Sequence, residues 1–295
     1  MSYLFDFAII GGDNRQIFLA DFLCQKGFSI CYYGLNLEAL PLKYIKNFSN
    51  HIITNCPSFE YAIEHSKYIV GPIPFSKDNI YVTTHPLYQI SISTLCSMMK
   101  SDQLLFAGAF SKSFVSLAST NHILIIDMMK WEDAAIMNTV ATAEGAIYEA
   151  IQKSNINLQG GNSLILGFGR CGQILAKKVK ALDSNLSVSV RKKEVLSLAL
   201  AYGYNGFLLA DLESHIEDFD FIFNTIPSII LTKEILCKAK DEVTIIDIAS
   251  SPGGVDYDYA KLHSLNASLC LGLPGKISPK SSAQILLGNI LSYCN

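Results

Sequence analysis

The chain has 295 residues, of which 50% are hydrophobic and 17% are charged, and its formal net charge at pH 7 is −3. This composition excludes an intrinsically disordered chain and argues against a nucleic-acid-binding protein, which usually carries a basic patch. The length suits about two domains of roughly 150 residues each. No run of about 18 apolar residues is present and the N-terminus lacks a basic signal segment, so we expect no membrane association.

The eight cysteines are scattered, with no C-x-x-C pair and no cysteine–histidine cluster at zinc spacing. A long chain with dispersed cysteines is typical of the reducing cytoplasm, so we expect a cytoplasmic protein without a metal site.

Strand-like and helical segments alternate along the chain, which is typical of βαβ units and parallel sheets. In the first half, the pattern predicts a helix at 16–25 and strands at 4–10, 29–33, 68–70, 104–107 and 123–126. Loops are expected at 71–79 and 83–86, where prolines occur. A long helix at 131–153 follows; its interior is rich in small residues, and Gly145 there indicates a close approach by another segment.

In the second half, the pattern predicts helices at 173–182 and 279–291, and strands at 163–167, 186–190, 206–209, 219–225, 243–248 and 268–272. We therefore predict an α/β protein of two Rossmann-like domains with parallel sheets and a cleft between them. Residues 1–138 form a flavodoxin- or Rossmann-like substrate domain, and residues 139–278 form a doubly wound dinucleotide-binding domain. We expect the last helix, within 279–295, to pack back on the first domain.

The dinucleotide assignment depends on a G-x-G-x-x-G motif that follows a buried strand and opens a helix. Its residues are Gly167, Phe168, Gly169, Arg170, Cys171 and Gly172. The first glycine makes the tight turn, the second lets the backbone approach a pyrophosphate, and the third allows the helix to pack closely on the strand. The free N–H groups of the helix N-terminus then favour the anion.

The next strand ends in Arg191, Lys192 and Lys193, where an NAD site usually has a carboxylate for the ribose. Three cations favour a 2′-phosphate, so we predict NADP rather than NAD, the alternative being a solvated basic turn. Backbone groups in the loops after two later strands are candidates to face the nicotinamide; these residues are Asn224, Thr225, Ile226, Pro227 and Ser250.

Cations at loop ends are candidates to bind a carboxylate of the substrate. Arg15 follows a Gly11-Gly12 turn at a helix start, and Lys276 and Lys280 flank the turn before the last helix. Ser251 and Ser281 are further candidates from neighbouring loops. For catalysis, His85 and Glu144 are candidate proton acceptors, although a lone histidine is more often structural and Glu144 is as well placed to pair with a cation.

Taken together, these segments resemble the A subunit of dipicolinate synthase from spore-forming bacteria. The similar segments are 9–13, 15–16, 142–145, 166–172, 224–228, 249–254, 272–275 and 279–280, and they span nearly the whole chain. The resemblance implies oxidation of a dihydrodipicolinate-type intermediate of the lysine pathway to dipicolinate with NADP, in the mother cell during sporulation. It also implies a partner, which is a separate flavoprotein-like B subunit.

One position departs from the resemblance, because Ser251 stands where some members have a basic residue. A carboxylate clamp would then have to come from Arg15, Lys276 or Lys280. Two other hypotheses remain open: a 2-hydroxyacid or amino-acid dehydrogenase, and a non-catalytic NADP-binding regulatory subunit. Since the chain is apolar and poorly charged, we also expect it to form a homo-oligomer.

Overall fold

The computed structural model of the chain describes residues 3–50 and 52–294. The chain divides into two compact units. We call Met1–Ala135 together with Ser278–Asn295 the N-terminal unit, and Ile136–Ile277 the C-terminal unit.

The N-terminal unit contains a six-stranded parallel sheet in the order β3-β2-β1-β4-β5-β6. Its strands are β1 (Phe5–Ile10), β2 (Ile30–Tyr33), β3 (Thr54–Asn55), β4 (Ser66–Val70), β5 (Leu104–Ala107) and β6 (Leu124–Asp127). This is the Rossmann strand order rather than the flavodoxin order. The central strands are buried on both faces, which explains why their sequences read as continuous apolar runs rather than alternating ones.

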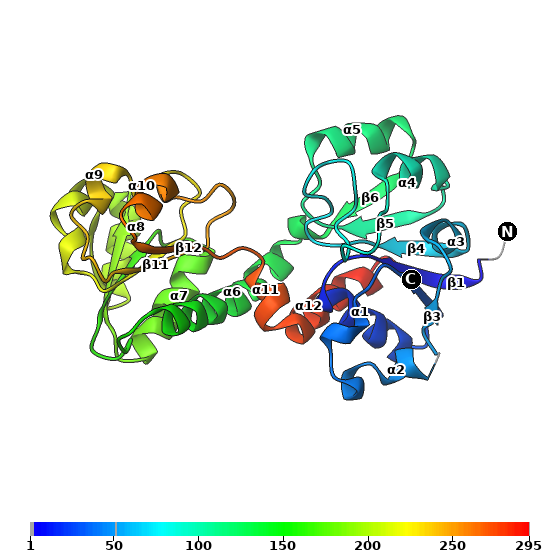
Figure 1. The fold of residues 1–295 in the computed structure, drawn as a ribbon, viewed down its shortest axis with the longest axis horizontal. Coiled ribbons are helices and arrows are strands. Elements are labelled where there is room, and N and C mark those ends of the chain that lie inside the picture. Colours follow the sequence, from blue (N-terminus) through cyan, green and yellow to red (C-terminus); the bar gives the residue numbers. More distant parts are fainter. Residues whose placement is uncertain (1–2, 51, 295) are drawn as a thin grey trace. The chain divides into compact units, whose positions relative to one another are not determined.

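Helices cover both faces of this sheet (Figure 1). One face packs on α1 (Asn14–Gln25), α2 (Lys46–Ser49) and α12 (Pro279–Leu291), and the other on α3 (Phe59–Glu64), α4 (Ile92–Met98) and α5 (Lys112–Thr120). Three 3₁₀ turns, η1 (Leu37–Ala39), η2 (Leu42–Tyr44) and η3 (Met128–Lys130), complete the unit.

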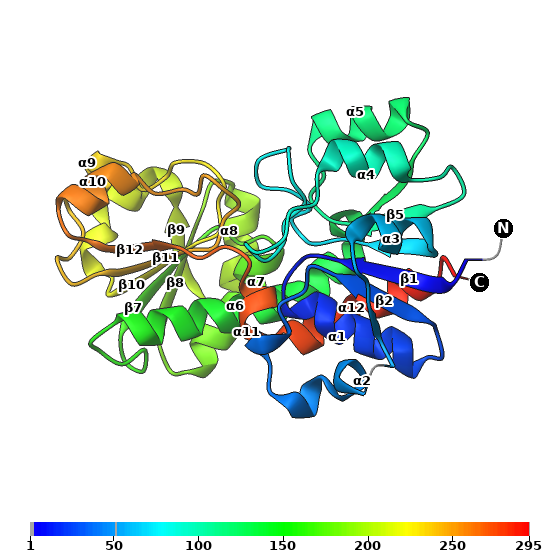
Figure 2. The same ribbon diagram turned by 45° about the vertical axis from the view of Figure 1, so that its right-hand side comes forward.

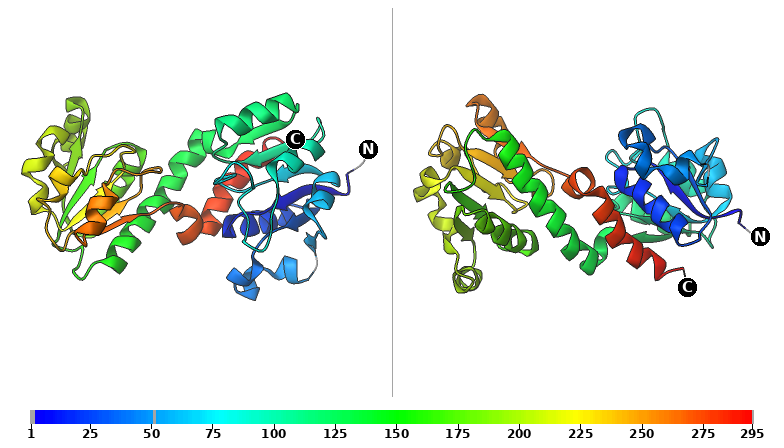
Figure 3. Two further views of the ribbon diagram at one scale, coloured as in Figure 1. Left: turned by 45° about the horizontal axis from the view of Figure 1, so that its top comes forward. Right: turned by 90° about the horizontal axis from the view of Figure 1, so that it is seen from below.

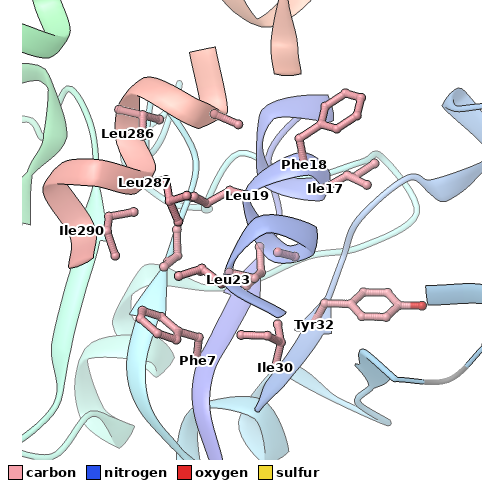
Figure 4. Close-up of a cluster of buried hydrophobic side chains, with 14 of the residues drawn as sticks. Phe7, Ile17, Phe18, Leu19, Leu23, Ile30, Tyr32, Leu286, Leu287 and Ile290 are labelled. Atoms are coloured by element: carbon pink, nitrogen blue, oxygen red, sulfur yellow. The ribbon is translucent and has the colours of Figure 1, made fainter. Parts of the chain in front are cut away.

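The last helix belongs to the core of the N-terminal unit, because α12 lies beside α1 (Figure 3). Leu286, Leu287 and Ile290 of α12 point toward Leu19 and Leu23 of α1 in one buried cluster (Figure 4). Burying each such side chain contributes about 1.5–3 kcal/mol, which holds the C-terminal segment on the first sheet.

The C-terminal unit repeats the same topology with strand order β12-β11-β10-β7-β8-β9. Its strands are β7 (Asn162–Leu166), β8 (Asn185–Val190), β9 (Asn205–Leu208), β10 (Phe221–Asn224), β11 (Thr244–Asp247) and β12 (Asn266–Leu269). One face packs on α6 (Glu132–Lys153), α7 (Arg170–Ala181), α8 (Lys193–Ala201) and α11 (Leu273–Ile277). The other packs on α9 (Lys233–Leu236), α10 (Tyr257–Leu262) and the 3₁₀ turns η4 (Leu209–Ser214) and η5 (Ile216–Asp218), as Figure 2 shows for α9 and α10.

The prediction of two Rossmann-like α/β domains is confirmed by the two sheets. The glycine inside the long helix has a packing reason, because a Cβ on Gly145 would come within 2.9 Å of the Leu273 Cβ on α11. Among the described residues, no helix is both long and apolar enough to cross a membrane.

Candidate functional site

The carboxyl ends of β7 and β10 lie side by side at the point where the strand order of the C-terminal unit reverses. Ligands of open α/β sheets bind at such a switch point. Gly167 makes the turn after β7 with φ +95°, a left-handed conformation that favours glycine. A Cβ there would clash with Thr225 Oγ1, and Thr225 Oγ1 itself donates to Leu166 O at 2.8 Å. The absence of a side chain at Gly167 therefore allows the loops after β7 and β10 to pack in direct contact.

The other two glycines of the motif have the geometry of a phosphate cradle. Gly169 is the N-cap of α7; it caps the helix with no side chain, and a Cβ built on it would meet no atom within 4 Å. Gly172 packs directly on the Gly167 carbonyl oxygen, which leaves no room for a side chain. The N-terminus of a 12-residue helix is thus open to an anion, as a bound pyrophosphate requires.

The side chains between these glycines face in different directions. Phe168 is buried and packs against Tyr204, with ring centroids 5.9 Å apart, so it anchors the turn in the core. Arg170 is exposed, and Cys171 is half-buried. Burial raises the pKa of the Cys171 thiol, which keeps it neutral beside the cradle.

A buried carboxylate, Asp247, lies next to the predicted nicotinamide loops and was not among the residues predicted from the sequence. Asp247, at the end of β11, is fully buried and accepts hydrogen bonds from Asn224 Nδ2 at 2.8 Å and from Gly254 N at 2.6 Å. It also accepts from Ala249 N and from the hydroxyl of Tyr257, both at 3.0 Å. Asp247 therefore holds the loops after β10 and β11 together. In the sequence, an acidic residue at the end of an apolar strand is the feature that could have indicated this role.

Asp247→Ala is expected to destabilise the protein by at least about 2 kcal/mol, because it leaves buried donors without an acceptor. The measurement is urea unfolding, with Asp241→Ala, at an exposed position of the same unit, as the matched control. Equal unfolding midpoints for both variants would contradict this role.

The three cations predicted for a 2′-phosphate follow β8 directly. Arg191, Lys192 and Lys193 are all exposed, and Lys192 is the N-cap of α8. Within the described residues none of the three forms an ion pair, so their charges are available to a ligand at the end of β8, next to β7. The predicted nicotinamide-facing residues lie at the ends of β10 and β11. Asn224 is buried, Thr225 and Ile226 are half-buried, and Pro227 and Ser250 are exposed.

In the N-terminal unit, the turn after β1 is arranged differently from the cradle after β7. Asp13 caps α1, accepting from Arg15 N at 2.9 Å, while Gln16 Oε1 accepts from Asp13 N. The buried Arg15 guanidinium pairs with the Asp13 carboxylate at 2.7 Å and donates to Ile73 O at 2.6 Å. Arg15 was expected to bind a carboxylate of the substrate, whereas here it pairs with the Asp13 carboxylate at the start of α1.

His85 lies on the loop that covers this turn. The Thr83 carbonyl accepts from Gly12 N at 2.9 Å, which holds the loop over the end of β1. Thr83 Oγ1 and His85 Nδ1 are buried and make no hydrogen bond within the described residues. An unpaired buried imidazole nitrogen is costly in a core, so it favours a binding role over a structural one.

The remaining candidates have no such burial. Glu144, on α6, pairs with Lys178 of α7 at 2.8 Å, the cation pairing that its sequence position left open. Lys276 on α11, Lys280 and Ser281 on the first turn of α12, and Ser251 after β11 are exposed. The described residues contain no group of three or more histidine, cysteine or acidic side chains that could hold a metal ion.

The two repeated sheets define a class of protein, one built from two Rossmann-like α/β domains. An L-alanine dehydrogenase structure matches with a TM-score of 0.62 at 15% identity, covering 97% of this chain and 88% of the other; at that identity the likeness concerns the fold alone.

Other relatives are more similar to the chain in sequence. Residues 6–129 match the family described as the N-terminal domain of the dipicolinate synthase A subunit. The A subunit of dipicolinate synthase from Bacillus subtilis (strain 168) is 29% identical over 97% of this chain and 94% of the relative. The crystal structure of the A subunit of dipicolinate synthase from Bacillus halodurans has a TM-score of 0.85 at 26% identity, covering 98% of this chain and 97% of the other. The chain is thus similar along nearly its whole length to dipicolinate synthase A subunits, and residues 6–129 match the model of their N-terminal domain.

Proposed function

We propose that this chain is an NADP-dependent dehydrogenase that oxidises a dihydrodipicolinate-type intermediate to dipicolinate. The observation that carries the proposal is the open N-terminus of α7 at Gly169, at the switch point of a Rossmann sheet, with three exposed cations after the neighbouring strand. The similarity to dipicolinate synthase A subunits suggests the substrate class.

The C-terminal unit would hold the dinucleotide. The segment from Gly167 to Gly172 would bind the pyrophosphate, Arg191–Lys193 the 2′-phosphate, and the loops carrying Asn224 to Pro227 and Ser250 the nicotinamide. When bound, the nicotinamide supplies hydride acceptance. Asp247 keeps these two loops in place through its hydrogen bonds to Asn224 and Gly254.

The substrate is a dianion, so its carboxylates need cationic or N–H donors. Lys280 and Ser281 lie on the first helical turn of α12, where helix N–H groups and a positive dipole end also favour an anion. In the C-terminal unit, Lys276 and Ser251 are the corresponding donors. Arg15, held by Asp13, is better suited to orienting the Gly11-Gly12 turn than to a full bidentate clamp.

Aromatisation of the ring also releases a proton, and His85 is the better placed of the two predicted acceptors. Its Nδ1 has no partner among the described residues, whereas the Glu144 carboxylate pairs with Lys178.

His85→Gln is expected to lower kcat by about 10²–10⁴-fold while leaving NADP affinity unchanged, because proton transfer by a positioned side chain contributes that much. Steady-state kinetics and NADP titration check this. His122→Gln, at an exposed position of the same unit, is the control, and an unchanged kcat for His85→Gln would remove it from the proposal.

We extend the proposal to the cytoplasm of the mother cell of a sporulating bacterium and to a partner, the separate B subunit. The test is a substrate panel with the purified chain, with and without that partner: the lysine-pathway intermediate, 2-hydroxyacids and L-alanine. The proposal is supported if the lysine-pathway intermediate is turned over and the other substrates are not. Turnover of L-alanine would instead favour an amino-acid dehydrogenase. No turnover in either condition would contradict the proposal and leave a non-catalytic role.

A further inference from the structure

The N-terminal unit contains a cavity of about 220 Å³ at the carboxyl ends of β2 and β3. Its lining consists of Tyr32, Leu35, Asn36, Leu37, Glu38, Asn55, His85, Leu87 and Tyr88. We propose that this cavity binds an uncharged ribonucleoside, as the base-and-ribose half of a Rossmann site that has lost its phosphate half. The cavity is too small for a dinucleotide, since pockets for drug-sized ligands already span about 300–1,000 Å³.

The position of the cavity supports a nucleoside. Both units share one topology, so β1 and β2 correspond to β7 and β8. In Rossmann sheets the ribose lies at the end of the strand that follows the glycine-rich turn. In the C-terminal unit that place has Arg191–Lys193; in the N-terminal unit it has the cavity, with Tyr32 paired across the sheet to Asn55.

The charge at this place is reversed between the two units. Glu38, which is exposed, follows β2 on the turn η1, and the described lining residues include neither lysine nor arginine. A carboxylate here is suited to accept hydrogen bonds from the two ribose hydroxyls, as in NAD-binding domains. The same carboxylate, without a cation beside it among the described lining residues, favours an uncharged ligand in this cavity.

The phosphate half of the site is closed by the chain itself. Asp13 caps α1 and its carboxylate occupies the helix N-terminus that a phosphate would need. The loop above also uses an N–H group of the turn, because Gly12 N donates to the Thr83 carbonyl at 2.9 Å. At the equivalent place in the C-terminal unit, Gly169 caps α7 with open space around it. A nucleoside therefore fits where a nucleotide does not.

The walls suit a flat heterocycle. Tyr88 packs edge-on against Tyr33, with ring centroids 5.3 Å apart, and Thr84 Oγ1 donates to the Tyr88 carbonyl at 2.7 Å, so the aromatic wall is fixed. Asn36 and Asn55 supply amide donors and acceptors for base edges. Burial raises the pKa of Tyr32, which keeps its hydroxyl a neutral donor.

Calorimetric titration of the full chain, saturated with NADP⁺ so that the C-terminal unit is filled, tests the proposal with adenosine as probe. We expect one adenosine site, at least about 10-fold weaker binding of adenosine 5′-monophosphate, and at least about 10-fold weaker adenosine binding in Glu38→Gln, since one charge-assisted hydrogen bond contributes about that factor. Glu64→Gln, at an exposed position at the end of α3, is the matched control and should bind as the parent does. Asn55→Ala provides a second variant, also expected to weaken adenosine binding.

No adenosine binding to the NADP⁺-saturated chain would overturn the proposal, as would equal affinity for the monophosphate or unchanged binding in both cavity variants. The readout is binding rather than turnover. A failure here is therefore distinguishable from a failure of the proposed dehydrogenase activity.

Discussion

Gly169→Asp is expected to weaken NADP⁺ binding by at least about 100-fold without loss of folding stability. The φ of −80° and the open space at this N-cap accept a side chain, and aspartate is a favourable N-cap residue, so α7 should be as stable or more stable. The new carboxylate, however, would occupy the helix N-terminus and repel the pyrophosphate, as Asp13 does on α1. A 100-fold loss corresponds to about 2.7 kcal/mol of binding free energy.

Fluorescence or calorimetric titration with NADP⁺ measures this effect, and thermal unfolding measures stability. Gly169→Ala is the matched control, because it adds a Cβ without the charge and should retain most of the affinity. If Gly169→Asp bound NADP⁺ as tightly as the parent, the pyrophosphate would not lie on the N-terminus of α7.

Arg191→Asp is expected to reverse the cofactor preference from NADP to NAD. The guanidinium can hold a 2′-phosphate with two charge-assisted hydrogen bonds, which contribute about 1.5–3 kcal/mol each. A carboxylate in its place repels that phosphate and accepts from the 2′-hydroxyl of NAD instead. We expect NADP⁺ affinity to fall by about 100-fold and NAD⁺ affinity to rise.

Parallel titrations with both dinucleotides measure the preference. Lys261→Asp, an exposed position on α10 of the same unit, makes the same charge change away from β8 and should leave the preference as it was. Unchanged NADP⁺ affinity in Arg191→Asp would mean that the three cations after β8 form only a solvated turn.

Most of the fold could be predicted from the sequence because the strands of both sheets are buried on two faces. Segments such as Phe7–Ile10 and Phe221–Asn224 therefore appear as short, largely apolar runs. The strand β3 was missed because it is two exposed residues, Thr54 and Asn55, paired to β2. The short helices α3 and α4 were missed because seven or fewer residues give little periodicity.

The candidate site could be predicted only where local sequence determines it. The motif from Gly167 to Gly172 carries its own turn and helix start, and the structure forms both. Pairings between distant residues were beyond sequence reasoning: the partner of Glu144 is Lys178 on the next helix, and Asp247 collects donors from two separate loops. The Asp13–Arg15 pair is local, but its guanidinium is also held by Ile73 O, 58 residues away in the chain.

The low charge of the chain has a partial explanation in the structure. Two parallel sheets, each covered on both faces, bury much of the apolar content in four clusters. Among the exposed cations, Arg191–Lys193 directly follow β8, which pairs with β7 beside the switch point of the C-terminal sheet.

The central claim is that this chain itself passes hydride from a dihydrodipicolinate-type intermediate to NADP⁺. The most direct measurement is a single-turnover reaction of the purified chain with NADP⁺ and the lysine-pathway intermediate, following reduced nicotinamide by absorbance and dipicolinate by chromatography. We predict that the two products form in equal amounts and that Gly169→Asp abolishes both. Dipicolinate formed without reduced nicotinamide, or neither product formed even with the B subunit present, would contradict the claim.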